Sequence, residues 1–353
     1  VQAGILTAKN IIDASDAQYN TRVGGNAGNS FDGTNATHNT LIGYNAGTAI
    51  TDGDRNTAVG SGALDTNTTG SQNTAIGMNA LYTNSTGSNN VAVGENALSL
   101  STTASDNVAV GDEALEANTT GARNVAVGRQ ALEANTTANN NNAFGYQALL
   151  LNTIGASNNA FGKSALDANT TGSNNTAMGH NTLGANTTAS NNTGIGYQVL
   201  AVNTTGAQNT AVGANALDAN TTAINNTAVG YDALGANTTG QQNVAVGAYT
   251  ADAITTGVYN TAIGEQSMRG VTTGSNNTAL GKSALQTSTA NDNTAVGYNA
   301  LNANTTGQHN VGVGGSALAA NTTASANTAV GYLAGASNTT GSANCAFGKD
   351  ALY

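Results

Sequence analysis

A unit of seventeen residues repeats along almost the whole chain, and this repeat restricts the possible folds more than any other feature of the sequence. Each copy contains a glycine that closes an Asn-x-x-x-Gly motif, and twenty such glycines run from Gly24 and Gly43 to Gly348. Only two spacings differ from 17 residues: 19 between Gly24 and Gly43, and 16 between Gly281 and Gly297. Seventeen residues are too few for a helical-hairpin repeat, which needs more than about thirty. We therefore predict that each copy forms one coil of a solenoid.

The pattern within a copy indicates short strands and turns. The residue before the glycine is apolar in all twenty copies, and the alternation in Thr-Ala-Val is typical of a strand. We predict an all-β fold, a parallel β-solenoid of about 20 coils over residues 20–353, with equivalent strands stacked about 4.8 Å apart. Residues 1–19 do not follow the repeat and are predicted to form an N-terminal cap or assembly segment.

An asparagine stands four residues before the glycine in every copy. Asparagine tolerates left-handed turns, and its amide can both donate to and accept from the asparagine of the next coil. We therefore predict a structural asparagine ladder in preference to a binding site. From the third copy onward its members are Asn56, Asn73, Asn90, Asn107, Asn124, Asn141, Asn158, Asn175, Asn192, Asn209, Asn226, Asn243, Asn260, Asn277, Asn293, Asn310, Asn327 and Asn344.

The alternation also predicts which side chains face inward. The apolar residue before the glycine and the residue two positions earlier share one face of the strand, which we expect to face the interior together with a leucine column. The residue between them is always Ala or Gly from Ala58 onward, so we expect this outward face to lie against another backbone. A thin coil buries little by itself, which favours a side-by-side homotrimer. A monomer with a plain Ala surface is the alternative.

The motifs "NNVAVGENAL", "NTAVGYNAL" and "NTAIGMNAL" resemble the YadA-like head repeat of trimeric autotransporter adhesins. The longer pattern with Asn-Thr-Thr-Gly is similar to repeats in bacterial and phage tail-fibre-type proteins. The resemblance covers residues 20–353, although the usual head repeat is shorter than this one. It implies a left-handed parallel β-roll of three chains side by side, acting as a surface-exposed stalk or a receptor-binding head.

Composition argues against several classes of function. The formal charge is −10 and the nine Lys and Arg residues are scattered, so nucleic acid is not an expected partner. No apolar stretch is long enough to predict a membrane span. The three histidines, His38, His180 and His309, lie far apart in the repeat, and no cofactor or metal motif is present. We therefore expect no enzyme activity and no cofactor.

Two columns could contact other molecules. Six tyrosines directly follow the repeat glycine and are expected to face solvent, where they could bind sugars or proteins: Tyr44, Tyr146, Tyr197, Tyr231, Tyr298 and Tyr332. Acceptor motifs for N-glycosylation recur in the Asn-Thr-Thr stretch, which we expect on an exposed edge. The candidates are Asn67, Asn84, Asn118, Asn135, Asn169, Asn186, Asn203, Asn220, Asn237, Asn304, Asn321 and Asn338.

These observations predict a non-enzymatic extracellular fibre, such as an adhesin or tail-fibre shaft on a cell or virion surface. Its expected partners are copies of itself and, through exposed loops, glycans or a host-surface receptor. One alternative is an extracellular filament, carrying glycans or not, that grows by end-to-end stacking of solenoid ends. A less favoured alternative is an ice-binding solenoid, because adjacent threonines point to opposite sides of a strand.

Overall fold

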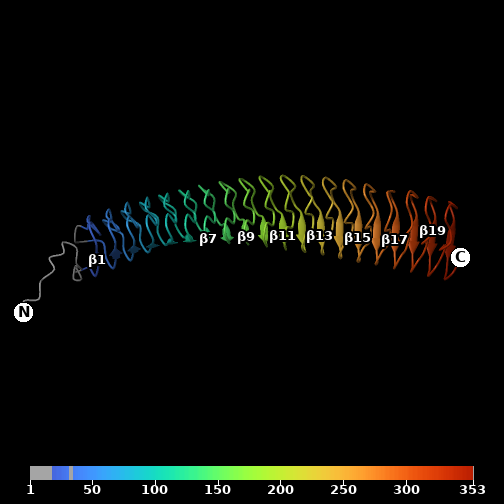
Figure 1. Ribbon diagram of the computed structural model, residues 1–353, viewed down its shortest axis with the longest axis horizontal. Helices are drawn as coiled ribbons and strands as arrows, with labels where there is room; N and C mark the ends of the chain where they lie inside the picture. The colour runs from blue at the N-terminus through green and yellow to red at the C-terminus, as the bar shows by residue number, and fades with distance from the viewer. Residues whose placement is uncertain (1–17, 32–34, 353) are drawn as a thin grey trace, which may run out of the picture. The chain divides into compact units, whose positions relative to one another are not determined.

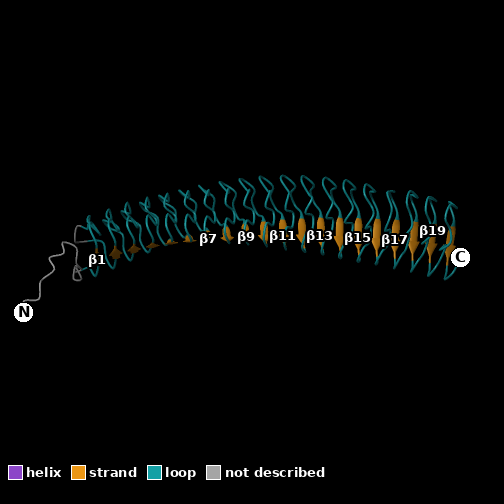
Figure 2. Cartoon of the chain, in the orientation of Figure 1, coloured by secondary structure: helices purple, strands orange, loops and turns teal. Residues whose placement is uncertain are grey.

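The computed structural model describes residues 18–31 and 35–352. In this part of the chain it is an all-β parallel solenoid of three-residue strands joined by turns and loops, with no helix (Figure 2). The chain divides into two compact units, Val1–Ser173 and Asn174–Tyr353, and we describe each by itself. Of the predicted N-terminal segment, residues 1–17 lie outside the described residues.

Each coil contributes one strand to the sheet of its unit, and the strands lie on the same side of successive coils (Figure 1). The strands of the first unit are β1 Thr21–Val23, β2 Thr40–Ile42, β3 Thr57–Val59, β4 Thr74–Ile76, β5 Val91–Val93, β6 Val108–Val110, β7 Val125–Val127, β8 Asn142–Phe144 and β9 Asn159–Phe161. Those of the second unit are β10 Thr176–Met178, β11 Thr193–Ile195, β12 Thr210–Val212, β13 Thr227–Val229, β14 Val244–Val246, β15 Thr261–Ile263, β16 Thr278–Leu280, β17 Thr294–Val296, β18 Val311–Val313, β19 Thr328–Val330 and β20 Cys345–Phe347.

Strand pairing within each unit is parallel and follows the repeat. In the first unit Thr57 pairs with Thr74, and in the second unit Thr210 pairs with Thr227, 17 residues further on in both cases. The shorter spacing leaves the register intact, because Thr278 pairs with Thr294 and the missing residue falls in the loop. The predicted parallel β-solenoid with a seventeen-residue repeat is confirmed.

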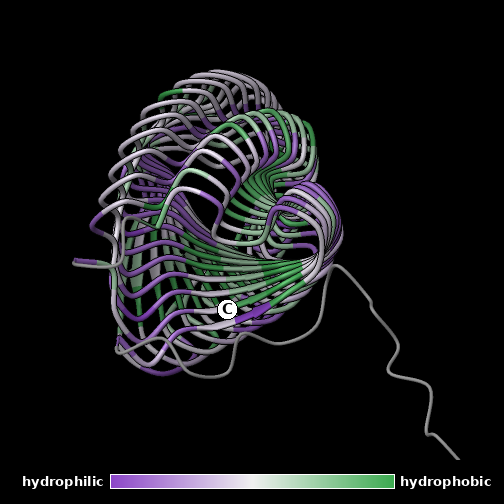
Figure 3. Cartoon of the chain, turned by 90° about the vertical axis from the view of Figure 1, so that its left-hand side faces the viewer, coloured by the Kyte–Doolittle hydropathy of each residue, from purple (hydrophilic) through white to green (hydrophobic). Residues whose placement is uncertain are grey.

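The predicted orientation of the strand residues is wrong. The central Ala faces the interior and is fully buried, as at Ala58 and Ala228. The apolar residue before the glycine faces outward: Ile76 is 40% exposed and Ile263 is 42% exposed. The predicted leucine column is confirmed as interior, and Leu64, for example, has no exposed surface. Figure 3 shows that equivalent positions in successive coils share their hydropathy, so apolar and polar positions form stripes along each unit.

The narrow interior explains why the central strand residue is small. At Gly312, which replaces Ala in β18, an added Cβ would lie 3.2 Å from the carbonyl oxygen of Ala317 and 3.3 Å from Cγ of Leu301. A methyl group fits this space with little to spare, and a larger side chain does not where the coil also carries its leucine. The central residue of β2 is the buried Leu41, and in that coil Gly47 stands at the leucine position and leaves room for it. The Ala column is therefore small because of the coil's own interior, and contact with an external backbone is not needed to explain it.

The corners of the coil depend on left-handed backbone conformations. In the coil that starts at Gly213, Asn215 has φ 57°, Leu217 has φ 52° and Asn225 has φ 60°. We expected this conformation at the ladder asparagines, but it occurs at the residue before each of them, such as Asn225 before Asn226. A leucine with positive φ is strained, and here burial of its side chain in the interior offsets the strain.

Candidate functional site

The asparagines four residues before the glycine form a buried hydrogen-bonded row. The backbone N–H of Asn73 donates to Oδ1 of Asn56 at 2.9 Å, and Nδ2 of Asn73 donates to the carbonyl oxygen of Gly87 at 2.9 Å. The same pattern recurs at Asn226, which accepts from the backbone N–H of Asn243 at 2.9 Å. Both ends of the Asn73 and Asn226 amides are therefore engaged inside the coil, where an unpaired amide would be costly.

The asparagines predicted as glycosylation acceptors form a second buried row. Eleven of the twelve have no exposed surface, and only Asn338, in the last coil, is partly exposed. Nδ2 of Asn84 donates to Oδ1 of Asn67 at 2.8 Å and to the carbonyl oxygen of Gly87 at 2.9 Å. The expectation of an exposed edge is wrong, because this amide closes the loop from the inside. The nitrogen that a glycan would modify is inaccessible at these eleven positions in the folded coil.

The first threonine after each of these asparagines also supports the coil. The Oγ1 of Thr68 donates to the carbonyl oxygen of Ser85 at 3.0 Å, and the Oγ1 of Thr119 donates to that of Thr136 at 3.0 Å. These hydroxyl groups bridge successive coils. They are therefore occupied within the protein and do not form a free array that could order water.

The six tyrosines after the repeat glycine face solvent, as expected, with exposed fractions from 41% at Tyr146 to 61% at Tyr44. They do not gather into one site, because other residues occupy this position in the intervening coils. Some contact a neighbouring coil: Tyr197 stacks on His180 of the preceding coil with ring centroids 5.6 Å apart, and the rings of Tyr231 and Tyr249, in the following coil, meet edge to face with centroids 5.2 Å apart.

The outer face of the sheet is the surface that our reading of the sequence assigned to the interior. We define it as the first and third residues of strands β1–β20, described separately for the two units. The third residue is apolar in all twenty strands, and the first is Thr in twelve, Val in five, Asn in two and Cys in one. Neighbouring coils cover part of these side chains, yet Ile42, Met178 and Ile195 remain 38–43% exposed. This is an apolar stripe along each unit.

Charged residues occur on the other exposed columns and are absent from this face. The position after the glycine holds Glu95, Asp112, Arg129 and Glu265, among others. Neighbouring charges there form exposed ion pairs between coils, such as Arg129 with Asp112 at 3.1 Å, which contribute little to stability. Neither outer-face position carries a charged residue in any of the twenty strands. The outer face is thus chemically distinct from the rest of the exposed surface.

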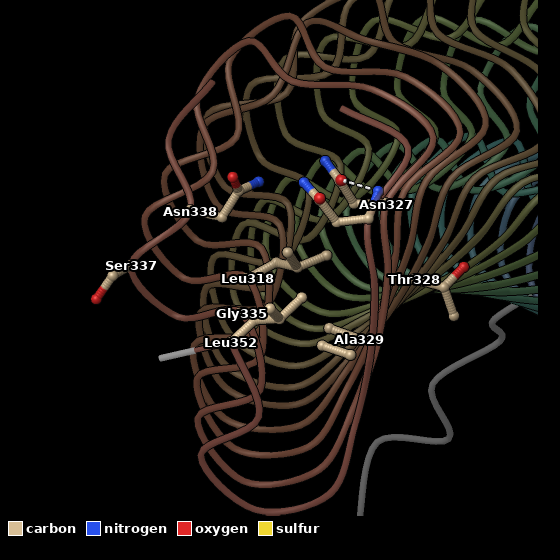
Figure 4. Close-up of a pocket in the computed structure, with 10 residues that line it drawn as sticks. Leu318, Asn327, Thr328, Ala329, Gly335, Ser337, Asn338 and Leu352 are labelled. Carbon is tan, nitrogen blue, oxygen red and sulfur yellow. Dashed lines mark hydrogen bonds between the residues drawn. The ribbon is translucent and has the colours of Figure 1, made fainter. Parts of the chain in front are cut away.

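A cavity of about 260 Å³ lies at the last described coils (Figure 4). Leu318, Asn327, Ala329 and Ala346 line it, and all belong to the interior columns described above. The dashed line in Figure 4 is the ladder bond from the backbone N–H of Asn344 to Oδ1 of Asn327, at 2.9 Å. The cavity is therefore a continuation of the coil interior.

Among the described residues, no group of three or more His, Cys, Asp or Glu side chains could hold a metal ion. No helix in the described part of the chain could cross a membrane. The rings of His38 and Tyr19 stack with their centroids 5.2 Å apart, and Nε2 of His309 lies 3.7 Å from Oδ2 of Asp292. The structure therefore does not bring these histidines into one site.

Partial burial should make the protein more stable in mild acid than at neutral pH. Desolvation is the main cause that raises the pKa of six carboxyl groups, those of Glu116, Glu133, Asp167, Asp218, Asp232 and Asp252. The folded state then binds these protons more tightly than the unfolded state, so stability falls as pH rises. The stabilisation that protonation of these groups gives the folded state is complete below their ordinary pKa, 3.8 for Asp and 4.5 for Glu. It disappears above the raised pKa of the folded state. A denaturant midpoint lower at about pH 4 than at about pH 7 would contradict this.

No protein-family model, no curated protein and no solved structure matches the chain.

Proposed function

We propose that the protein is a non-enzymatic structural shaft outside the cell, built from three chains that associate side by side through the outer face of the sheet. One observation carries the proposal: the outer face excludes charge in all twenty strands, while the other exposed columns accept it. Soluble monomers rarely expose large apolar patches, and such patches usually mark interaction sites.

The repeat makes a weak contact per coil sufficient for stable association. Covering the exposed 36–43% of one outward Val, Ile, Phe or Met side chain contributes roughly 1 kcal/mol. Four third-position side chains in each unit have exposures in this range, and the others except Phe347 are less exposed, so the sum over both units is on the order of 10 kcal/mol. This is comparable with the cost of association, about 4–15 kcal/mol. Contacts along both units would therefore favour a stable assembly.

A second copy of the same chain is the partner that best fits this face. Its side chains repeat with the same spacing between coils, so parallel chains in register match at every coil. The resemblance to trimeric autotransporter adhesins supports three chains and an extracellular location. In such an assembly, the tyrosines after the repeat glycine stay outside the interface and are the candidates for contact with a receptor or glycan.

An uncharged face with Thr columns also invites comparison with ice-binding surfaces. Eight of the twenty strands lack the outward Thr, and Phe144 and Phe161 project from the face of the first unit in succession. The Phe144 and Phe161 rings stack with centroids 4.8 Å apart. Such large side chains interrupt a regular hydroxyl array but fit a protein interface. We therefore favour association.

Light scattering or sedimentation gives the mass in solution and tests this function. We expect a mass of three 34.7 kDa chains for the unaltered protein. Ile195→Glu with Val212→Glu places two charges on the outer face and should yield single chains, because each would be buried unpaired.

The matched control is Tyr197→Glu with Ala214→Glu, in the same two coils but at the position where Glu95 and Glu265 occur naturally. This control should keep the mass of the unaltered protein, and circular dichroism should show folded coils in both variants. A monomeric unaltered protein would refute the proposal, and so would an assembly that tolerates the outer-face charges.

A further inference from the structure

Most of the outer face in the first unit is too uniform to fix the position of one copy of the chain along another. In β3–β7 the first residue is Thr or Val and the third is Val or Ile. These side chains are all β-branched and of similar size, so a second copy that slides by one coil meets nearly the same surface. The pattern of side chains sets strand register, and a pattern that is the same at every step leaves it open. A defined assembly therefore needs strands that differ from the rest.

Strands β8 and β9 are the exception in the first unit. Both read Asn-Ala-Phe, and among the twenty strands of the described residues only these two have Asn at the first position. Phe stands at the third position in these two strands and otherwise only in β20. Asparagine is disfavoured in strands. Its occurrence in two successive strands, each time together with Phe, therefore indicates a role other than stabilising the strand.

The four side chains form one feature on the outer face. Nδ2 of Asn142 donates to Oδ1 of Asn159 at 2.8 Å. The rings of Phe144 and Phe161 stack with their centroids 4.8 Å apart and their planes within 5° of parallel, and the two residues are 36% and 37% exposed. Strands β8 and β9 thus present a pair of amides beside a pair of aromatic rings.

The two amides keep hydrogen-bonding capacity that the chain itself does not use. Within the described residues, Oδ1 of Asn142 and Nδ2 of Asn159 make no hydrogen bond, and both atoms retain exposed surface. An amide nitrogen carries two N–H groups, so Asn142 also has one N–H to spare. Each amide can therefore both donate to and accept from the same amide of another copy.

We propose that β8 and β9 fix the register in which copies of this chain associate, an inference that rests on the lateral association proposed above. In register, Asn142 of one copy meets Asn142 of the next, Asn159 meets Asn159, and the spare donors and acceptors pair between chains. A shift of one coil places one amide of each pair against an apolar or Thr position, such as Val125, where it is buried without a partner. A polar residue in an apolar interface selects the register of coiled coils in the same way.

Disulfide trapping of the full chain measures the register. Cys345→Ser removes the natural thiol, and either Thr40→Cys or Thr74→Cys then places a single thiol on the outer face, at sites two coils apart. Ile42→Cys and Ile76→Cys sample the other column of this face in the same way. Disulfides require Cα atoms about 4.4–6.8 Å apart, whereas two coils separate the sites by about twice the 4.8 Å strand spacing. When chains of two tag sizes are co-expressed, we expect same-site cross-links to exceed mixed-site cross-links at least ten-fold.

The test variant replaces all four side chains with the residues of β3, as Asn142→Thr, Phe144→Val, Asn159→Thr and Phe161→Val. It should still associate, because the rest of the face is unchanged, but mixed-site cross-links should become as frequent as same-site ones. If circular dichroism shows that the coils of this variant are lost, Asn142→Thr with Asn159→Thr replaces it and should also raise the mixed-site fraction.

The control is Val91→Thr with Val108→Thr, which alters the first position of β5 and β6 and leaves β8 and β9 intact. It should keep the preference for same-site cross-links. If light scattering shows three chains, the inference is overturned by a same-site preference that survives in the test variant, by its loss in the control, or by an unaltered face that gives no such preference in either column. A single-chain mass would instead refute lateral association itself, and the register inference with it.

Discussion

Gly213→Ala is expected to lower the free energy of unfolding by more than about 3 kcal/mol, because two independent effects oppose a side chain here. Gly213 has φ 124°, a conformation that L-residues with a Cβ rarely adopt. An added Cβ would also lie 2.6 Å from the carbonyl carbon of Gly230 in the next coil. The clash is with backbone, so no side-chain rotation relieves it. The coils must separate locally or the chain must leave its register.

The damage should be local at first, because each coil of a solenoid contacts only its neighbours. Hydrogen exchange followed by mass spectrometry should show lost protection in residues 196–247, and the thermal midpoint should fall. The control is Gly206→Ala, since Ala189 and Ala223 occupy the same repeat position in the adjacent coils. An added Cβ at Gly206 would also crowd the backbone carbonyl oxygen of Ala223, so this control shares the close contact and isolates the effect of φ. Gly206 does not have a positive φ. Equal loss of protection in the two variants would show that backbone conformation is not the reason for the conserved spacing of glycines along the chain.

The period of the sequence was sufficient to predict the strands and their pairing. Stacking requires equivalent residues to lie opposite each other, so Thr57 opposite Thr74 follows from a spacing of 17. The same reasoning correctly predicted the buried leucine column. In both cases the prediction depended only on which residues repeat, and the coil's cross-section was not needed.

The direction of the strand side chains could not be obtained in this way. Alternation shows that Val212 and Ala211 face opposite sides, but hydrophobicity alone favours the larger residue inside. The leucine column and the corner at Leu217, with φ 52°, leave an interior only wide enough for Ala. The cross-section of the coil therefore decides the orientation, and the outer face was missed. The sequence shows that the residue before the repeat glycine is apolar in every copy. Such a column is as typical of a solenoid interior as of an exposed interface.

The Asn-Thr-Thr stretch was misread for a related reason. Its polarity and its acceptor motifs are typical of an exposed loop, yet Asn220 is buried because its amide donates to the carbonyl oxygen of Ala223 at 3.2 Å.

Asn226→Asp should destabilise the protein in a strongly pH-dependent way, although the two side chains have nearly the same shape. Asn226 is 1% exposed, and its Nδ2 donates to the carbonyl oxygen of Gly240 at 2.9 Å. A carboxylate would place an acceptor against this carbonyl and leave a buried charge with one remaining donor, the backbone N–H of Asn243. The expected loss at neutral pH is about 3–5 kcal/mol.

Acid should restore most of the lost stability. Burial raises the pKa of the introduced carboxyl, so the folded state binds its proton at a higher pH than the unfolded state. The destabilisation is therefore complete above the raised pKa and disappears as pH falls toward the ordinary value for Asp, because the neutral carboxyl can donate to Gly240 as the amide did. Denaturant midpoints between about pH 4 and pH 8 measure the effect. The control is Asn225→Asp, at an exposed position where Asp106 and Asp292 occur naturally, and it should change the midpoint little at any pH. A loss at Asn226→Asp that is the same at both ends of this range would show that burial of a charged carboxylate is not the cause of the destabilisation.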